Sequence, residues 1–271
     1  MRNLLVALAM GSAVVLVAAP SDAQAQRAGP NPIAVADSFY LREGDPGRAL
    51  EVLRPLVVSG ARESGGDPQL YDALWKAARA SLTIGILAEP RRGQAEWYRL
   101  AEEYGRRAVE LDSERPEGRY WLVATQGRMA LRAGAVEASS LAEAVRAGAH
   151  ELLERDPDHA GAHNALGRLY LAVLSLPRMY RMMGRALAGR TTFAEATWAA
   201  AEQHLARAVQ LEPGMVIYRV DLARFHLARR SWDAAATDLN VAQALPVVFP
   251  ADTLFQREAS QLRRRIPTAS R

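Results

Sequence analysis

Apolar residues recur at spacings of three and four along nearly the whole chain from Ile33 onwards. This spacing places them on one face of a helix, and no segment shows the two-residue alternation of a half-buried strand. The helical segments are separated by short stretches rich in Pro, Gly and Asp, namely REGDPG, SGARESGGDP, LDSERPEG, ERDPDHAG and LEPGM. Such short breaks favour antiparallel helical hairpins, so the pattern predicts an all-α protein.

Three of these breaks resemble one another: ELDSERPEGRYW, ERDPDHAGAHNALGRLY and QLEPGMVIYRVDLARFH. Each ends one helix with an acidic residue and begins the next after a turn that contains proline. That is the join between tetratricopeptide repeats, whose first helix carries a Leu-Gly-x-x-Tyr pattern. Leu166, Gly167 and Tyr170 supply this pattern, and residues 216–246 form the most regular repeat. The sequence therefore predicts a tetratricopeptide-like α-solenoid of antiparallel helical hairpins with insertions, over residues 33–250.

Two intervals between repeat joins are longer than a repeat of about 34 residues. Ser113 to Pro157 spans 44 residues, and Pro157 to Pro213 spans 56. Insertions in repeat proteins map to one face, so both intervals mark candidate functional surfaces. The longer one contains LSLPRMYRMMGRALAGR, residues 174–190, which we expect to close over one end of a groove. It could pack on a neighbouring repeat, offer its methionines to a partner, or lie on an anionic membrane.

The N-terminus has the layout of a secretory signal peptide. Arg2 precedes an apolar run from residue 4 to 19, and Ala23-Gln24-Ala25 forms a small-x-small cleavage site. We expect cleavage after Ala25 and a periplasmic or secreted protein, because the apolar run falls short of the roughly 20 residues that span a bilayer. Retention as an N-terminal anchor is the alternative. Residues 26–32 then form a short linker, and residues 251–271 a C-terminal helix with a basic tail.

The amino-acid composition limits the classes of function that the sequence supports. Lys76 is the only lysine among the 34 basic residues, which together with abundant alanine indicates a GC-rich bacterial genome. The net charge of +4 is small, and with the export signal it argues against nucleic-acid binding. We expect no membrane contact beyond the signal peptide.

Catalysis and metal binding find little support in the sequence. The chain has no cysteine, no glycine-rich phosphate loop and no grouping of acid, base and nucleophile, so we expect neither an enzyme nor a cofactor. His159 and His163 stand four residues apart, a spacing that can hold a metal, but the intervening glutamate of a zinc motif is missing. Packing or capping is the simpler interpretation, and we expect no metal site.

Four segments, read together, resemble the regulator of microtubule dynamics family over roughly residues 33–246: LWKAARASL, AVELDSERPEGRYW, AHNALGRLYLAVLSLPRMYRMMGRALAG and AEQHLARAVQLEPG. The matching positions are Trp75, Ala78, Arg79, Ala80, Ser81, Trp121, His163, Gly167, Arg168, Pro177, Arg181 and Gly189. The resemblance implies a helical scaffold that binds partners without catalysis. Eukaryotic members associate with microtubules or organelle membranes, whereas an exported bacterial relative would meet no microtubule.

The sequence thus predicts a scaffold that binds a protein or peptide in the concave groove of a helical array. First helices line the inner surface of such arrays. The predicted partner-binding residues are Arg119, Trp121, His163, Asn164, Arg168 and Arg181. The alternative function is a carrier of a lipid or other apolar ligand in the cell envelope.

Overall fold

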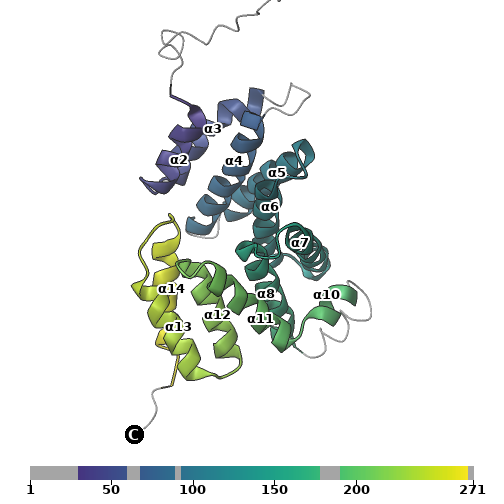
Figure 1. The fold of residues 1–271 in the computed structure, drawn as a ribbon, viewed down its shortest axis with the longest axis vertical. Coiled ribbons are helices and arrows are strands. Elements are labelled where there is room, and N and C mark those ends of the chain that lie inside the picture. The colour runs from purple at the N-terminus through teal and green to yellow at the C-terminus, as the bar shows by residue number, and fades with distance from the viewer. Residues whose placement is uncertain (1–29, 60–67, 89–92, 178–189, 268–271) are drawn as a thin grey trace, which may run out of the picture. The chain divides into compact units, whose positions relative to one another are not determined.

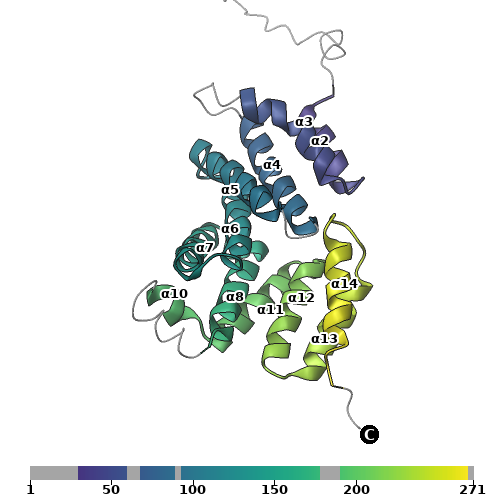
Figure 2. The same cartoon turned by 180° about the vertical axis from the view of Figure 1, so that it is seen from behind.

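The computed structural model describes residues 30–59, 68–88, 93–177 and 190–267. The chain divides into two units, Met1–Asn31 and Pro32–Arg271, and all the helices described below belong to the second unit (Figures 1 and 2). In chain order they are α2 (Pro32–Leu41), α3 (Pro46–Ser59), α4 (Pro68–Leu87), α5 (Gln94–Leu111), α6 (Pro116–Ala130), α7 (Ala135–Arg155), α8 (Ala160–Ser175), α10 (Arg190–Glu195), α11 (Trp198–Leu211), α12 (Val216–Ala228), α13 (Trp232–Ala244) and α14 (Asp252–Arg263). The described residues contain no strand, which confirms the predicted fold class.

Each predicted break lies between two helices of the structure. Proline begins α2, α3, α4 and α6. Proline has no N–H to donate, and the first turn of a helix has no internal acceptor for one, so proline fits there without loss. At the break before α8, His159 caps the helix, because its Nδ1 accepts a hydrogen bond from the backbone N–H of Ala162 at 3.1 Å.

The helices form consecutive antiparallel pairs: α2 with α3, α4 with α5, α6 with α7, α8 with α11, and α12 with α13. Each first helix also contacts the first helix of the next pair, from α2 through α4, α6, α8 and α12 to α14. Figure 1 shows this succession along the chain. The first helices are therefore packed together on one side of the array, which is the arrangement of a helical solenoid.

Small residues allow the paired helices to approach each other. A Cβ atom added at Gly167 on α8 would lie 2.5 Å from Cγ of Leu205 and 3.0 Å from its backbone nitrogen, on α11. Leu166, Tyr170 and Leu205 are fully buried around this contact. The Leu-Gly-x-x-Tyr pattern that predicted the repeat thus marks a close contact of the α8–α11 pair.

The C-terminal segment returns to the beginning of the array. Phe249, in the loop between α13 and α14, packs against the hydrophobic cluster formed by α2 to α5. Conversely, Ile86 at the end of α4 packs against the cluster formed by α12, α13 and α14. These two contacts bring the first and last helical pairs together across the face of the first helices.

The expected closure of residues 174–190 over the groove stays a prediction. Most of residues 174–190, including Arg181, lies outside the described residues. The helix that follows, α10, packs against α7 and α8. Glu195 on α10 accepts hydrogen bonds from the Tyr170 hydroxyl at 2.9 Å and from Arg146 at 3.3 Å. Helix α10 therefore extends the α7–α8 side of the array.

The close approach at Gly167 gives a test of the helical pairing. Replacing Gly167 with valine should lower the free energy of unfolding by about 1–3 kcal/mol, because the new side chain meets the backbone of Leu205. The measurement is the denaturant midpoint. Gly214→Val is the matched control, since a Cβ there has no neighbour within 4 Å. Equal midpoints for the two variants would contradict the packing of α8 on α11.

Candidate functional site

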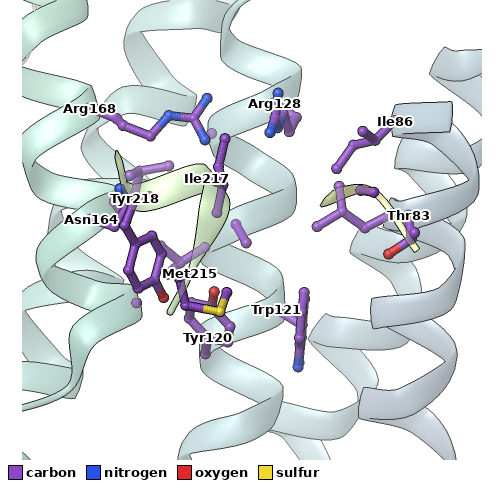
Figure 3. A pocket seen from close by; sticks show the side chains of 18 of the residues that line it. Thr83, Ile86, Tyr120, Trp121, Arg128, Asn164, Arg168, Met215, Ile217 and Tyr218 are labelled. Carbon is purple, nitrogen blue, oxygen red and sulfur yellow. The ribbon is translucent and has the colours of Figure 1, made fainter. Parts of the chain in front are cut away.

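A cavity of about 470 Å³ lies on the face of the first helices. Its walls come from α4, α6, α8, α12 and the C-terminal segment, and most of the side chains are apolar (Figure 3). Ligand pockets in proteins commonly have volumes of about 300 to 1,000 Å³ and are lined in this way. The cavity is therefore large enough for a small molecule or for a few residues of a peptide.

Small side chains on α6 and α8 make the space. Ala124 and Gly127 on α6 and Ala165 and Ala172 on α8 all line the cavity. Their spacings of three and seven residues place the members of each pair on one face of their helix. Larger side chains at these positions would fill the cavity.

The C-terminal segment covers part of the cavity. Phe249, Ala251, Asp252 and Phe255 line it opposite the first helices. The carboxylate of Asp252 accepts hydrogen bonds from the backbone N–H groups of Val248 at 3.0 Å and Phe249 at 2.8 Å. These bonds fix the turn before α14, which holds the aromatic rings of Phe249 and Phe255 at the cavity wall.

One end of the cavity is charged. Asp221 on α12 is only 1% exposed and pairs with Arg168 at 3.4 Å and with Arg224. Asn164 donates a further hydrogen bond to the same carboxylate at 3.2 Å. Arg224 also pairs with Glu258 on α14. Asp221 thus joins α8, α12 and, through Arg224, α14.

Arg128 reaches the same end from α6. Figure 3 shows Arg128 and Arg168 at one end of the pocket and Tyr120, Trp121 and Met215 at the other. Burial, followed by repulsion from Arg168, lowers the pKa of Arg128 to about 10. The group remains charged at neutral pH, so the cavity contains a cationic end and an apolar body.

Two tyrosines form part of the far wall. The hydroxyl groups of Tyr120 and Tyr218 hydrogen-bond to each other, and burial raises the pKa of both. Tyr120 lies against Gly161, where an added Cβ would be 2.2 Å from the ring. Both side chains are therefore neutral and held in place. They form part of the cavity wall in their protonated state.

Three of the predicted partner-binding residues come together at this cavity. Trp121, Asn164 and Arg168 all line it. The sequence-based prediction missed Arg128, although it stands seven residues after Trp121 and therefore on the same face of α6. This spacing of seven residues could have identified Arg128 from the sequence. No local sequence pattern indicated that the C-terminal segment would line the cavity.

Arg119 and His163 are not among the residues that line the cavity. Arg119 packs with Val123 against Gly148 on α7, and its guanidinium group pairs with Glu151 at 2.8 Å. His163 stands four residues before Gly167 and so shares the face of α8 that packs on α11. Both residues lie on first helices, but their side chains face the second helix of their pair. Arg181 lies outside the described residues.

His163 forms a direct contact with a second histidine. Its Nδ1 is 2.8 Å from Nδ1 of His204 on α11, and its Nε2 is 2.9 Å from the carbonyl oxygen of Pro157. A carbonyl only accepts, so Nε2 of His163 donates to it. In the neutral pair, Nδ1 of His163 is then the acceptor and Nδ1 of His204 the donor. His159 and His163 therefore have separate roles, one as a helix cap and one as a link between α8 and α11.

The cavity offers side chains that can contact a ligand. In the described residues, no group of three His, Cys, Asp or Glu side chains is placed to hold a metal ion. The same residues include no helix that is both long and apolar enough to cross a membrane. The cavity offers an apolar surface, two guanidinium groups, one amide and the carboxylates of Glu212 and Asp252.

The stacked helical pairs define a tetratricopeptide-like helical repeat protein. The profile of the family described as Regulator of microtubule dynamics protein 1-3 matches residues 56–266. Because this match covers most of the chain, the protein belongs to that family, which confirms the resemblance found in the sequence. No curated protein is significantly similar to the chain.

Solved structures share the fold at low sequence identity. A thermophilic TPR protein of Thermus thermophilus has a TM-score of 0.58 and 18% identity, with 86% of this chain and 97% of that chain covered. YrrB, a TPR protein with an unusual peptide-binding site, has a TM-score of 0.40 and 12% identity, with 85% and 90% covered. A monomeric mutant of IFIT1 with Gppp-AAAA has a TM-score of 0.45 and 12% identity, with 81% and 49% covered. At 18% identity the first likeness shows the fold alone.

The histidine contact predicts a pH-dependent stability. Burial, and then the charges of His163 and His150, lower the pKa of His204 from 6.5 to about 4, against an opposing effect of Glu195. Between these two values the unfolded chain carries more protons on this ring than the folded chain does. The free energy of unfolding should therefore fall as the pH drops from 6.5 to about 4, and this contribution should level off below that.

The measurement is denaturant unfolding at a series of pH values. His204→Phe should flatten the slope in this interval because the titrating ring is gone. Gln203→Phe, one residue away on the exposed face of α11, is the control and should keep the slope. A slope unchanged by His204→Phe would contradict the assignment.

Proposed function

We propose that this protein is an exported, non-catalytic scaffold that binds a segment of a protein or peptide partner in the cavity of its first helices. The observation that carries the proposal is the cavity itself, about 470 Å³ in volume and bounded by the first helices and the C-terminal segment. Its walls combine apolar side chains with a cationic end, and such a combination gives both affinity and orientation to a bound segment.

The arrangement of the helices supports the same function. Several first helices and the C-terminal segment contribute to one surface, so a short segment can contact several repeats at once. Trp121 offers a large, partly buried ring, and Met215 an adaptable side chain. Aromatic and methionine side chains are typical of surfaces that bind peptides.

A second function, the carriage of an apolar ligand, is favoured by one observation. The C-terminal segment partly closes the cavity, and Phe249 and Phe255 add to its apolar wall. A semi-enclosed apolar space can also hold a small hydrophobic molecule. A mass increment of lipid size on the purified protein under native conditions would support this function instead.

Filling the cavity tests the scaffold function. Ala165→Trp places an indole ring inside the cavity and should abolish capture of the partner by a photo-crosslinker at Ile217, in intact cells. Val136→Trp is the matched control, because Val136 on α7 is 88% exposed and does not line the cavity. The circular dichroism of both variants should remain helical.

The opposite pattern would overturn the proposal. If the partner is still captured by the Ala165→Trp variant and by Ala124→Trp, which fills the cavity from α6, the partner binds another surface. If no cell-envelope protein is captured above background, the scaffold function fails as a whole.

Export is part of the proposal and rests on the N-terminal sequence. Edman sequencing of the protein isolated from the cell envelope should begin at Gln26, because Ala23 and Ala25 form the cleavage site. A protein that keeps Met1 in the cytoplasmic fraction would exclude export. A protein that keeps residues 1–25 in the membrane fraction would indicate an anchor.

A further inference from the structure

Glu212 lies at the end of the cavity away from Arg128 and Arg168. It stands in the turn between α11 and α12, where its carbonyl oxygen accepts a hydrogen bond from the backbone N–H of Met215 at 3.2 Å. Both residues line the cavity, and Figure 3 shows Met215 beside Tyr120 at the end away from the two arginines. Because the Glu212 side chain is also exposed, its carboxylate lies at the mouth of this end.

The charge of Glu212 is not balanced by a cation of the protein. Two guanidinium groups and two carboxylates line the cavity, namely Arg128, Arg168, Glu212 and Asp252. Both guanidinium groups are attracted by the carboxylate of Asp221. Asp252 accepts hydrogen bonds from backbone N–H groups. Glu212, in contrast, forms no ion pair with any residue that the structure describes. The unpaired charge at this end of the cavity is therefore negative.

Two aromatic rings stand at the same end. The ring centres of Tyr120 and Trp121 are 4.9 Å apart and their planes make an angle of 61°, so the rings form a corner. The face of an aromatic ring attracts a cation, most strongly in tryptophan. The protein uses this interaction internally, as where Arg229 stands 5.3 Å from the ring centre of Trp198. In the ranges that the structure describes, no cationic side chain stands over Tyr120 or Trp121.

We propose that this end of the cavity binds an arginine or lysine side chain of the partner polypeptide, with the positive charge near the Trp121 ring and the Glu212 carboxylate. The proposal rests on the proposed function, because it identifies the chemistry of a side chain that enters the cavity. Both side chains have a hydrocarbon stem, which can lie along Met215 while the charged group stays at the mouth. Repulsion from Arg128 and Arg168 at the other end favours this orientation.

The charge at the mouth favours a peptide side chain over a cationic lipid headgroup. A choline headgroup carries a phosphate within a few bonds of its ammonium group. A phosphate close to the carboxylate of Glu212 would be repelled, and like charges placed together across an interface are costly. The side chains of arginine and lysine bring the positive charge alone.

The test uses a mixture of hexapeptides with either arginine or citrulline at the third position and random uncharged residues elsewhere. Citrulline has nearly the same shape as arginine but no charge, and acetylated and amidated ends remove the charges of the termini. The mixture is equilibrated with immobilised mature protein, and mass spectrometry identifies the retained peptides. Arginine peptides should be enriched over citrulline peptides about two- to thirty-fold, the range that a cation on an aromatic ring provides.

Variants at the two groups test the assignment of the site. Trp121→Leu and Glu212→Gln should each lower the enrichment, and Glu212→Arg should favour the citrulline peptides. Because Glu212 is exposed and unpaired within the described chain, its variants should keep the circular dichroism and unfolding temperature of the unchanged protein. Glu202→Gln, which changes an exposed glutamate of α11 outside the cavity lining, is the matched control and should keep the full enrichment.

Several outcomes would overturn the inference. Equal retention of the two kinds of peptide, retention of neither, or full enrichment in both Glu212→Gln and Trp121→Leu would each do so. Retention of phosphatidylcholine from mixed micelles without enrichment of arginine peptides would assign this end to a lipid headgroup, and would overturn it as well.

Crosslinking in cells separates this inference from the proposed function. The segment of the partner that is captured by the photo-crosslinker at Ile217 should contain an arginine or lysine, as read by mass spectrometry of the crosslinked peptide. If the captured segment contains neither residue, and Ala165→Trp still abolishes capture, the scaffold function stands and the cationic side chain is excluded.

Discussion

The ion-pair network around Asp221 determines how the parts of the cavity are arranged. A carboxylate that is 1% exposed cannot remain without partners, and here it holds Asn164 and Arg168 from α8 and Arg224 from its own helix. Arg224 extends the network to Glu258 on α14. The same carboxylate therefore fixes the direction of Arg168 at the cavity end and helps to place the helix that covers the cavity.

The small residues of the first helices have two separate uses. On one face they permit contact between paired helices, as Gly167 does against Leu205. On another face of the same helix, Ala165 and Ala172 leave space that no side chain of the described structure fills. Helix periodicity keeps these faces apart, so a sequence rich in alanine can build a tight pair and an open cavity from one segment.

The repeat pattern was enough to predict the fold and part of the candidate site. Joins between repeats depend on proline, glycine and acidic residues within a few positions, so they are visible locally. Trp121, Asn164 and Arg168 were found because first helices face the groove. Arg119 and His163 do not line the cavity, because the same helices also have a face toward their pair, and choosing between the faces needs the exact rotation of each helix.

The repeat pattern could not predict that the C-terminal segment covers part of the cavity. Phe249 reaches the cluster of α2 to α5 across roughly two hundred residues of sequence, and no local spacing reports a contact of that kind. The position of Arg128 next to a carboxylate that other arginines already bind could not be predicted for the same reason, because it depends on which side chains the fold brings near. Arg224, which does not line the cavity, pairs with two carboxylates, whereas Arg128 pairs with none within the described chain. The contrast between these two arginines depends on their positions in the fold, which the repeat pattern does not specify.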